Sequence, residues 1–599
     1  MSRLDPFVRG LPDPERGRLR LTQWLDRLTS QETGLSQLES VPLLGRTFAL
    51  LMTTSTEVCN MISRNPEMGL SALDLDTGYA MSRVRMVREE AQRLTAHTVS
   101  FAHRLDRLRF LKDKHTVMLA MTDVGGFLPP RDIWAGISNL AEALLIEAAD
   151  AVWVEHAAAW NLPPQRSVGI VAFGKLGGGE LNYSSDVDLA FVVPDDTPDE
   201  QMPKLQRFCE RFRASVSDRM GRGALYRVDL RIRPFGSQGG VVNPMSVSSH
   251  YYQTHSEPWE HLALIRSRVL DGWPGMEEAW EAMRQKVSFA STRGEWVVDN
   301  LSDLRVRTTD VGGEDDLKRG RGGIRDVEFL VQLNQLLLGN RVPSLRTRHT
   351  IDALNALAEA GVLDRSETDR LIKGYTFLRQ VEHRCQLRGG QQTHTLPEEP
   401  LERCIVAASM GIGSLEQFEQ ELSSTREEVH EIYLRHMPTA GTRAHKRISR
   451  EVETWIGRLP EPDLYRTSLD ENQDSLDRMQ TLVRRAATLL PELPTAPSVT
   501  DEVMSGEILE EPVIANSIQN AKDLAGAAKA SWLRIASHWA LEPDIHASRR
   551  LVARATSLVQ RLALDLDVTV LGMGSLANNE LSWRSDFDVL IVATDEAAK

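Results

Sequence analysis

Residues 168–193 read VGIVAFGKLGGGELNYSSDVDLAFVV, and this stretch decides the fold. A short apolar run ends in a glycine turn, and a second apolar run follows a Ser-Asp-x-Asp string and stops at Pro194. Short apolar runs bounded by glycine or proline are typical of buried strands. The stretch therefore predicts two strands joined by a glycine-rich turn.

The same unit recurs near the end of the chain. Residues 568–593 read VTVLGMGSLANNELSWRSDFDVLIVA, 400 positions further on, and nine of the 26 aligned positions are identical. In the first copy the identical residues are Val168, Gly174, Leu176, Glu180, Leu181, Ser185, Asp186, Asp188 and Val192. Such a repeat predicts a duplicated domain. Because the sequence stops at Lys599, soon after the second strand, we expect the second unit to be incomplete.

Helical periodicity surrounds both units. Apolar residues recur at three- and four-residue steps through residues 1–160 and again from about 276 to 563. A third strand is expected over residues 224–234, where apolar and charged residues alternate. The sequence thus predicts an α+β protein that is predominantly α-helical.

Composition narrows the classes of function. Apolar residues make up 41% and charged residues 26% of the 599, which is ordinary for a globular protein. No run approaches the ~18 apolar residues of a membrane span, and the N-terminus lacks the apolar core of a secretion signal. The net charge of −14 argues against a nucleic-acid coat, and four dispersed cysteines favour neither zinc nor disulfides. We expect a cytoplasmic protein that binds neither nucleic acid nor membrane.

Asp186 and Asp188 are the first candidate site residues. They lie two apart on a predicted strand, so their side chains leave the same face. Adjacent carboxylates repel each other, and Mg²⁺ removes that penalty while binding substrate phosphates. The glycine turn upstream lets backbone N–H groups approach a phosphate, with Lys175 as a counter-charge. The alternative is a solvated strand edge, which the glycine turn and the repeat disfavour.

A third carboxylate, Asp229, lies in the expected strand at 224–234. It shares one face of that strand with Arg231 and Arg233. A carboxylate flanked by arginines suits a metal–phosphate site, because guanidiniums bind phosphate oxygens in pairs. The alternative is a solvent-facing strand held by ion pairs.

The glycine turn is not a P-loop. Residues 169–175 spell most of one, but Leu176 stands where a Ser or Thr metal ligand is required.

Two polar groups lie on predicted helices further along the chain. Gly322 opens one helix, and Glu382-His383-Arg384 lies on another. On the first helix an apolar stripe is formed by Ile324, Val327, Leu330 and Val331, and the other faces carry Arg325, Asp326, Glu328 and Gln332. The polar side chains of the two helices form an interhelical ion-pair network, line a nucleotide cleft or transmit a regulatory signal. His383 is not expected to bind a metal, because no second ligand lies at helical spacing.

The glycine turn, the Asp-x-Asp pair and a distal third aspartate resemble the DNA polymerase β-like nucleotidyltransferase superfamily. Five strings between about 160 and 400 resemble, in order, one family within it, the bifunctional glutamine synthetase adenylyltransferase/adenylyl-removing enzymes. They are FGKLGGGELNYSSDVDL (173–189), YRVDLRIRPFGSQG (226–239), WEHLALIRSR (259–268), RGGIRDVEFLVQ (321–332) and LRQVEHRCQLRGGQQTHTLP (378–397). The likeness returns at 551–599, whereas residues 1–150 match only in helical character.

The resemblance implies a polymerase β-like nucleotidyltransferase domain with a mixed sheet, a helical bundle in the middle and a second nucleotidyltransferase domain. The expected parts are an N-terminal helical region (1–160), an adenylyl-removing domain (161–275), a helical bundle domain (276–490), a linker with helices (491–546) and the incomplete start of an adenylyltransferase domain (547–599).

The resemblance also implies an activity. In this family the N-terminal domain removes AMP from a tyrosine of glutamine synthetase by phosphorolysis, giving ADP. The C-terminal domain transfers AMP from ATP to that tyrosine, and glutamine and a PII-type signal protein select the direction. Mg²⁺ is the implied cofactor. Stabilisation of the entering and leaving oxygens by two metal ions is the expected mechanism.

The resemblance also implies roles for individual residues, assigned where this sequence matches the family's motifs. Asp186, Asp188 and Asp229 would be the catalytic metal ligands of the removing site, and Asp586 and Asp588 would be two ligands of the transferring site. The implied nucleotide-binding residues are Gly174, Lys175, Gly177, Ser185, Arg231, Arg233, Gly574, Ser575 and Ser585.

Three departures from the family pattern bear on these roles. Ser575 replaces a lysine, Ala577-Asn578-Asn579 replaces the glycine run, and Ser256-Glu257 replaces a Gly-Arg pair. Because the third carboxylate of the second domain would lie beyond Lys599, we expect no working transferase site in this chain.

Two alternatives stay open on the sequence alone. One is a uridylyltransferase-like enzyme that acts on a small signal protein. The other is a regulatory scaffold built on one degraded and one incomplete nucleotidyltransferase fold.

Overall fold

The computed structural model describes residues 3–74, 83–98, 100–219, 221–290, 313, 315–436, 568–572 and 589–593. The chain divides into two compact units, Met1–Met437 and Pro438–Lys599. In the described residues the protein is mostly helical with a small mixed sheet, which confirms the predicted α+β class. None of the described helices is both long and apolar enough to span a membrane.

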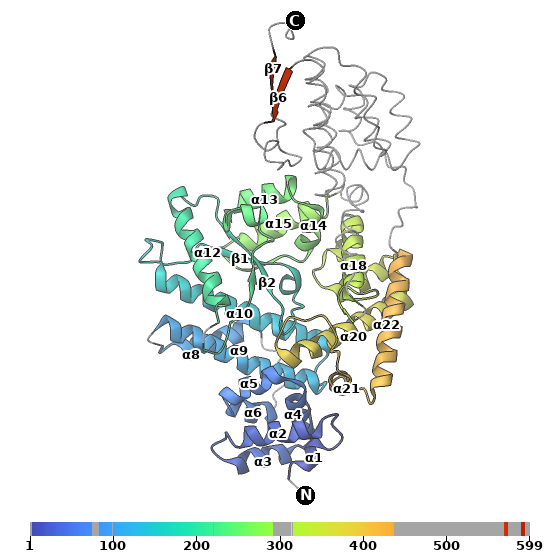
Figure 1. The fold of residues 1–599 in the computed structure, drawn as a ribbon. Helices are drawn as coiled ribbons and strands as arrows, with labels where there is room; N and C mark the ends of the chain where they lie inside the picture. Colours follow the sequence, from blue (N-terminus) through green and yellow to red (C-terminus); the bar gives the residue numbers. More distant parts are fainter. Residues whose placement is uncertain are drawn as a thin grey trace. The chain divides into compact units, whose positions relative to one another are not determined.

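The first unit begins with helices, as the periodicity predicts. The bounds are α1 (Asp5–Val8), α2 (Pro14–Leu25), α3 (Gln31–Ser40), α4 (Pro42–Thr54), α5 (Thr56–Arg64), α6 (Glu67–Leu73), α8 (Val84–Thr95), α9 (Phe101–Val124) and α10 (Pro130–His156) (Figure 1). Polar side chains cap several of them: Asp13 accepts from the backbone N–H of Arg16, and Ser55 from that of Val58. These caps fix where α2 and α5 begin.

Five strands form the sheet of the first unit: β1 (Gly169–Ala172), β2 (Val187–Val193), β3 (Val228–Asp229), β4 (Val242–Pro244) and β5 (Arg268–Asp271). The order is β3-β2-β1-β5, and β4 pairs with the far end of β2. β1 runs antiparallel to β2 and β5, whereas β3 and β4 run parallel to β2. The first two strands are those predicted from residues 168–193.

Both faces of the sheet are covered, because successive side chains point to opposite sides. Ile170 and Leu189 pack in a core with residues of α10 and of α12 (Met202–Ser217). Val171 and Ala190 pack in a second core with residues of α13 (Met245–Thr254), α14 (Pro258–Ile265) and α15 (Met276–Ser288). In Figure 1 these helices flank the strands on either side.

The strand predicted over 224–234 is wrong for most of its length. Only Val228 and Asp229 pair with β2, and the chain then turns. The carboxylate of Asp229 accepts the backbone N–H of Arg231 at 2.8 Å, and Phe235 takes a positive φ of 61°. Such a local side-chain bond to the backbone competes with the strand ladder and ends it.

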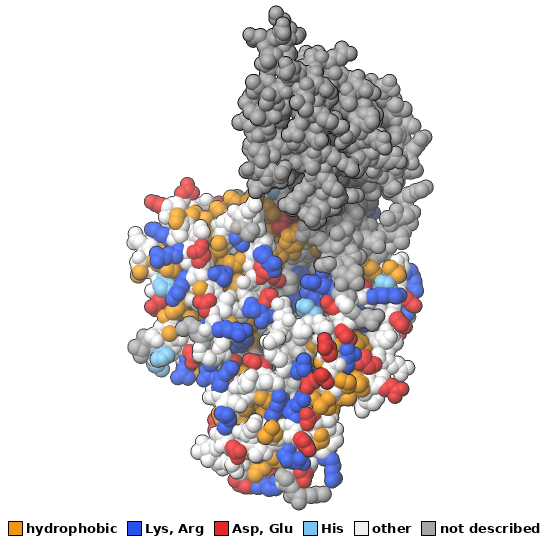
Figure 2. Space-filling model, in the orientation of Figure 1, with side chains coloured by type: hydrophobic (Ala, Val, Ile, Leu, Met, Phe, Trp, Pro, Cys, Tyr) orange, Lys and Arg blue, Asp and Glu red, His pale blue; other side chains and the backbone are white. Residues whose placement is uncertain are grey.

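The remaining helices of the first unit contribute to one shared core. They are α18 (Ile324–Leu338), α19 (Thr350–Glu359), α20 (Arg365–Gly389), α21 (Pro400–Ser409) and α22 (Leu415–His436). The short elements are α11 (Gly174–Gly177), η1 (Asp199–Gln201), η2 (Gly236–Gln238) and η3 (Pro343–Arg346). Side chains of both charge signs are interspersed over the described surface that Figure 2 shows.

In the second unit the described residues are two strands, β6 (Val568–Gly572) and β7 (Val589–Ala593). They pair antiparallel, with Thr569 opposite Val592. In the first unit Gly169 lies opposite Val192, so the two pairs share one register at the offset of 400. The candidate residues Gly574, Ser575, Ser585, Asp586 and Asp588 lie outside the described residues, as do residues 491–546.

Candidate functional site

The sheet brings the predicted aspartates together. Asp188 on β2 and Asp229 on β3 are directly paired in parallel register, and Asp186 lies one residue before β2 begins. Gly174 closes the site from the turn: it has a positive φ of 58°, and a Cβ there would lie 2.7 Å from Asp188 Oδ2. Three aspartates that are up to 43 positions apart in the sequence thus lie on or next to two neighbouring strands.

Asp188 is the unpaired member of this group. Within the described chain its carboxylate has no hydrogen-bond or ion-pair partner. Burial, and then the negative charges of Asp229 and Asp186, raise the pKa of Asp188 to about 6. A carboxylate left without an ion-pair partner beside two others is the electrostatic setting that a bound cation would relieve.

The other two carboxylates are held by arginines. Arg227 Nε donates to Asp186 Oδ1 at 2.6 Å, and Arg231 donates to both oxygens of Asp229 from Nε at 3.1 and 2.9 Å. The hydrogen bonds from Arg231 lower the pKa of Asp229. The side chains of Arg227 and Arg231 are 46% and 84% exposed, so each ion pair contributes under about 1 kcal/mol. Both arginines can therefore be displaced at little cost.

The donor set fits a hard divalent cation. Carboxylate oxygens are the ligands that Mg²⁺ and similar cations prefer, and Asp188 presents one with no competing partner. In the part of the chain that the structure describes, no group of three His, Cys, Asp or Glu side chains is placed to hold a metal ion. Because Asp186 and Asp229 turn towards their arginines, Arg227 and Arg231 would have to release them for all three to bind one ion.

Lys175 does not face the aspartates. Its ammonium donates to Glu382 Oε2 at 2.9 Å, and the two side chains are 12% and 0% exposed. Burial lowers the pKa of Lys175 to about 8, although Glu382 opposes the shift. Glu382 also accepts from Asn182 at 2.6 Å and lies 2.6 Å from Nδ1 of His394. The predicted phosphate counter-charge is thus already neutralised.

One face of α20 binds the turn between β1 and β2. Tyr375, Arg379, Glu382 and Gln386 recur at three- and four-residue steps, so they share that face. Arg379 donates to the backbone oxygen of Glu180 at 2.6 Å, and Gln386 accepts from the backbone N–H of Ser184 at 3.0 Å. His383 lies 3.1 Å from Asn182 Oδ1 in the same network. Of the uses left open for Glu382 and His383, the structure has the ion-pair network.

Of the remaining predicted residues, some hold the local structure around the site and one lies directly next to an aspartate. Gly177 is required for packing, because a Cβ there would lie 1.9 Å from the backbone oxygen of Arg266. Arg233 donates to the backbone oxygen of Leu230 at 2.6 Å and so holds its own turn. Ser185 is half-buried directly before Asp186.

Lys318 is a site residue that the sequence reasoning missed. It is half-buried in the turn before α18, and its positive charge lowers the pKa of Asp188. The predicted helix at Gly322 was the nearest signal, but a lone lysine four residues before that helix has no pattern of its own.

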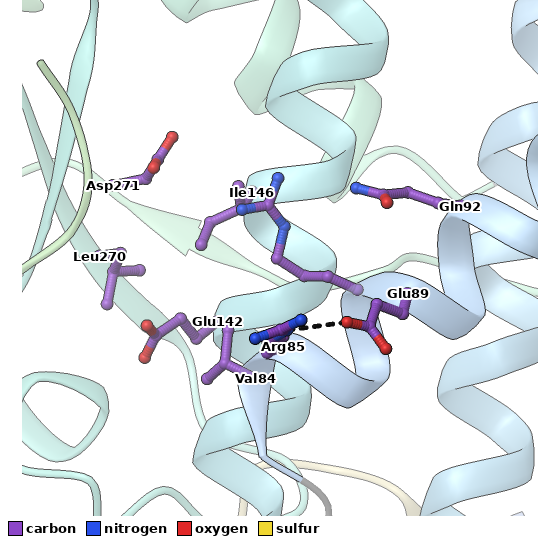
Figure 3. Close-up of a pocket in the computed structure, with 9 residues that line it drawn as sticks. Val84, Arg85, Glu89, Gln92, Glu142, Ile146, Leu270 and Asp271 are labelled. Carbon is purple, nitrogen blue, oxygen red and sulfur yellow. Dashed lines mark hydrogen bonds and ion pairs between the residues drawn. The ribbon is translucent and has the colours of Figure 1, made fainter.

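The one cavity characterised among the described residues lies elsewhere. It measures about 470 Å³ and is lined by Arg85 and Glu89 of α8, Glu142 of α10 and Asp271 of β5 (Figure 3). Arg85 and Glu89 are ion-paired at 2.8 Å, and Glu142 and Asp271 are paired with Arg268 and Arg166. No predicted site residue lines it.

As a class, this is an α+β domain in which neighbouring strands of a small mixed sheet present aspartates beside a glycine turn, the arrangement expected of a nucleotidyltransferase. Residues 46–283 match the family model described as glutamate-ammonia ligase adenylyltransferase. Residues 298–435 match the model described as GlnD PII-uridylyltransferase. The first match begins at residue 46, so the expectation that residues 1–150 resemble the family only in helical character is wrong from that residue on.

Curated relatives carry the name bifunctional glutamine synthetase adenylyltransferase/adenylyl-removing enzyme. The protein of Shewanella woodyi is 32% identical over 346 residues, 55% of this chain and 36% of its own. That of Thioalkalivibrio sulfidiphilus is 32% identical over 392 residues, 62% and 39% respectively. That of Xanthomonas oryzae pv. oryzae is 34% identical over 323 residues, 51% and 34%. The predicted family resemblance is confirmed over about half of the chain, which spans between 34% and 39% of these relatives.

Proposed function

We propose that the chain regulates glutamine synthetase by reversible adenylylation, and that residues 161–275 form its adenylyl-removing, polymerase β-like nucleotidyltransferase site. The observation that carries the proposal is the pairing of Asp188 with Asp229 on neighbouring strands, with Asp186 one residue before β2 and with no ion-pair partner for Asp188 among the described residues. The names of the relatives supply the protein substrate.

The proposed reaction is phosphorolysis. An oxygen of inorganic phosphate forms a bond to the phosphorus of the AMP–tyrosine ester, the phosphorus–phenol oxygen bond breaks, and ADP leaves. The phenolic oxygen, whose ordinary pKa is about 10, takes up a proton from water. Mg²⁺ held by Asp186, Asp188 and Asp229 would supply charge stabilisation at the phosphoryl group.

The chain's own residues orient the reactants in this proposal. The α20 network fixes the turn from Gly174 to Ser185, and the sheet register fixes the distance between Asp188 and Asp229. Arg231, once released from Asp229, is free to bind phosphate oxygens as a fork. Arg233 is the weaker candidate, because it already binds its own turn.

The direct test is release of ADP from adenylylated glutamine synthetase in the presence of phosphate and Mg²⁺. Asp186→Asn should abolish release, because one of three converging charges is lost. Asp199→Asn, a change at an exposed aspartate of η1, is the matched control and should keep the wild-type rate. Near-normal turnover of Asp186→Asn would overturn the site assignment.

A second candidate function has its own observation. Residues 298–435 match a PII-uridylyltransferase model, which favours a uridylyl-transferring relative acting on a small signal protein. Incubation with UTP and a PII-type protein, followed by intact-mass measurement, separates the two: a gain of one UMP supports uridylylation, and release of AMP from glutamine synthetase supports the first proposal.

The remaining parts of the proposal concern partners and place. A PII-type signal protein and glutamine would act as effectors, ATP and phosphate as substrates, and the acidic chain would work in the cytoplasm. Asp586 and Asp588 would belong to the adenylylating site. Binding of Mg²⁺–nucleotide by calorimetry also tests the scaffold alternative, because a scaffold without a working site need not bind it.

A further inference from the structure

The turn at residues 315–323 is held by hydrogen bonds within the turn and by close packing on α22. Asp316 Oδ1 accepts the backbone N–H groups of Lys318 and Arg319, both at 2.8 Å. Gly322, with a φ of 66°, packs so closely that a Cβ would lie 1.9 Å from the backbone oxygen of Arg426. The turn thus has little freedom to move relative to α22.

A chain of contacts joins this turn to the glycine turn of the sheet. Leu317 is fully buried, and its N–H donates to the backbone oxygen of His394 at 2.7 Å. His394 binds Glu382, and Glu382 binds Lys175, the neighbour of Gly174. The residue after Leu317 is therefore held near the glycine turn, and its positive charge acts on Asp188 although it lies 130 positions further along the chain.

The ammonium of Lys318, in the turn at residues 315–323, is not paired with another described side chain. Within residues 3–436, as far as they are described, its ammonium has no hydrogen bond or ion pair, and the side chain is half-buried. Its charge acts on Asp188, on Lys175 and on Glu328. Glu328 does not neutralise it, because that carboxylate binds Arg266 at 3.1 Å.

The other nearby cations are engaged. Lys175 is buried against Glu382, Arg227 binds Asp186, and Arg231 binds Asp229. A half-buried ammonium without a partner is costly to keep, and phosphate oxygens are strong acceptors for it.

We propose that Lys318 binds a phosphate group of the nucleotide at the Asp186–Asp188–Asp229 site, so that the helical bundle supplies the cation that the glycine turn does not. This inference rests on the proposed function, because it takes the site to hold a nucleotide. It makes the site composite: the sheet provides the carboxylates and the turn before α18 provides the positive charge.

The test is titration calorimetry of the full chain with Mg²⁺–ADP, the product of phosphorolysis. Lys318→Gln should weaken binding about tenfold or more, because a charge-assisted hydrogen bond is lost. Lys318→Arg should lose less, and Arg319→Gln, an exposed neighbour on the same turn, is the matched control with wild-type affinity. No variant should melt at a lower temperature than the wild-type chain, because within the described residues neither side chain has a hydrogen bond or ion pair to lose.

The outcomes separate this inference from the proposed function. Wild-type affinity in Lys318→Gln overturns the inference alone. Weak binding in Lys318→Gln supports it, even if the wild-type chain releases no ADP from adenylylated glutamine synthetase, a result that would overturn the proposed function alone. Absence of nucleotide binding by the wild-type chain overturns both. In the release assay the same variant should raise the KM for phosphate more than it lowers kcat.

Discussion

The charged side chains on the two sides of the β1–β2 turn differ in whether they are buried and paired. On the α20 side, Lys175 and Glu382 are buried and paired with each other. On the β3 side, Asp188 has no hydrogen-bond or ion-pair partner among the described residues, and the arginines on Asp186 and Asp229 are 46% and 84% exposed. Lys175 and Asp188 lie within one sequence motif, residues 168–193, so the motif alone does not distinguish their roles.

This difference helps to separate residues that support the site from residues that take part in its reaction. A buried charge that is fully paired is part of what stabilises the fold, because removing its partner leaves it buried and unpaired. A carboxylate that is left repelled by its neighbours has been placed at a cost to stability, which is typical of functional sites. By this criterion the α20 side holds the site in place, and the β3 side is the one that we propose does the chemistry.

The largest effect should come from breaking the paired side. Glu382→Ala leaves the Lys175 ammonium buried without its counter-charge, so the free energy of unfolding should fall by about 3–5 kcal/mol. Urea denaturation measures it. The double variant Lys175→Met/Glu382→Met should recover part of the loss, since neither charge then remains. If the double variant is no more stable than Glu382→Ala, the pair is not the structural unit described.

On the unpaired side, Asp188→Asn should cost activity instead of stability. The rate of phosphate-dependent ADP release should fall by about a hundredfold or more, because one of the three converging charges is lost. Rates are measured under saturating adenylylated glutamine synthetase, with Asp199→Asn as the control. An active Asp188→Asn variant would show that the unpaired carboxylate is not part of the chemistry.

The pH dependence of stability tests whether Asp188 is held at a cost to the folded state. The folded-state pKa of Asp188 is about 6, above its ordinary 3.8, so between these values the folded state binds the proton more tightly. Stability should therefore fall as pH rises from about 4 to 6, by about 1–3 kcal/mol. Asp188→Asn should remove this slope and raise the melting temperature at pH 7. A wild-type slope that persists in the variant would assign it to another group.

The smallest effect is expected at the exposed arginines. Arg227→Gln removes an ion pair to Asp186 that is 46% exposed on the arginine side, so the free energy of unfolding should change by under about 1 kcal/mol. Thermal melts at low and high salt measure it. A loss of several kcal/mol would mean that Arg227 is a structural partner of Asp186, and the contrast between the two sides would be weaker than described.

Local patterns predicted much of the fold. The apolar runs at 168–173 and 186–193 gave β1 and β2, and the stripe of Ile324, Val327 and Leu330 gave α18, because periodicity reports which face is buried. The strand at 224–234 failed, because Asp229 bonds to its own backbone and ends the ladder after two residues. β4 and β5 were missed, since strands of three and four residues show no clear alternation.

By itself the sequence determined the family resemblance, the repeat and the three aspartates, because strand periodicity and residue spacing are local properties of the chain. Only the tertiary structure decided which charges meet. Lys175 binds Glu382, 207 positions away, and Lys318 comes to lie beside Asp188. Pairing of side chains depends on which helices pack on which strands, and that is fixed by long-range burial that no local pattern encodes.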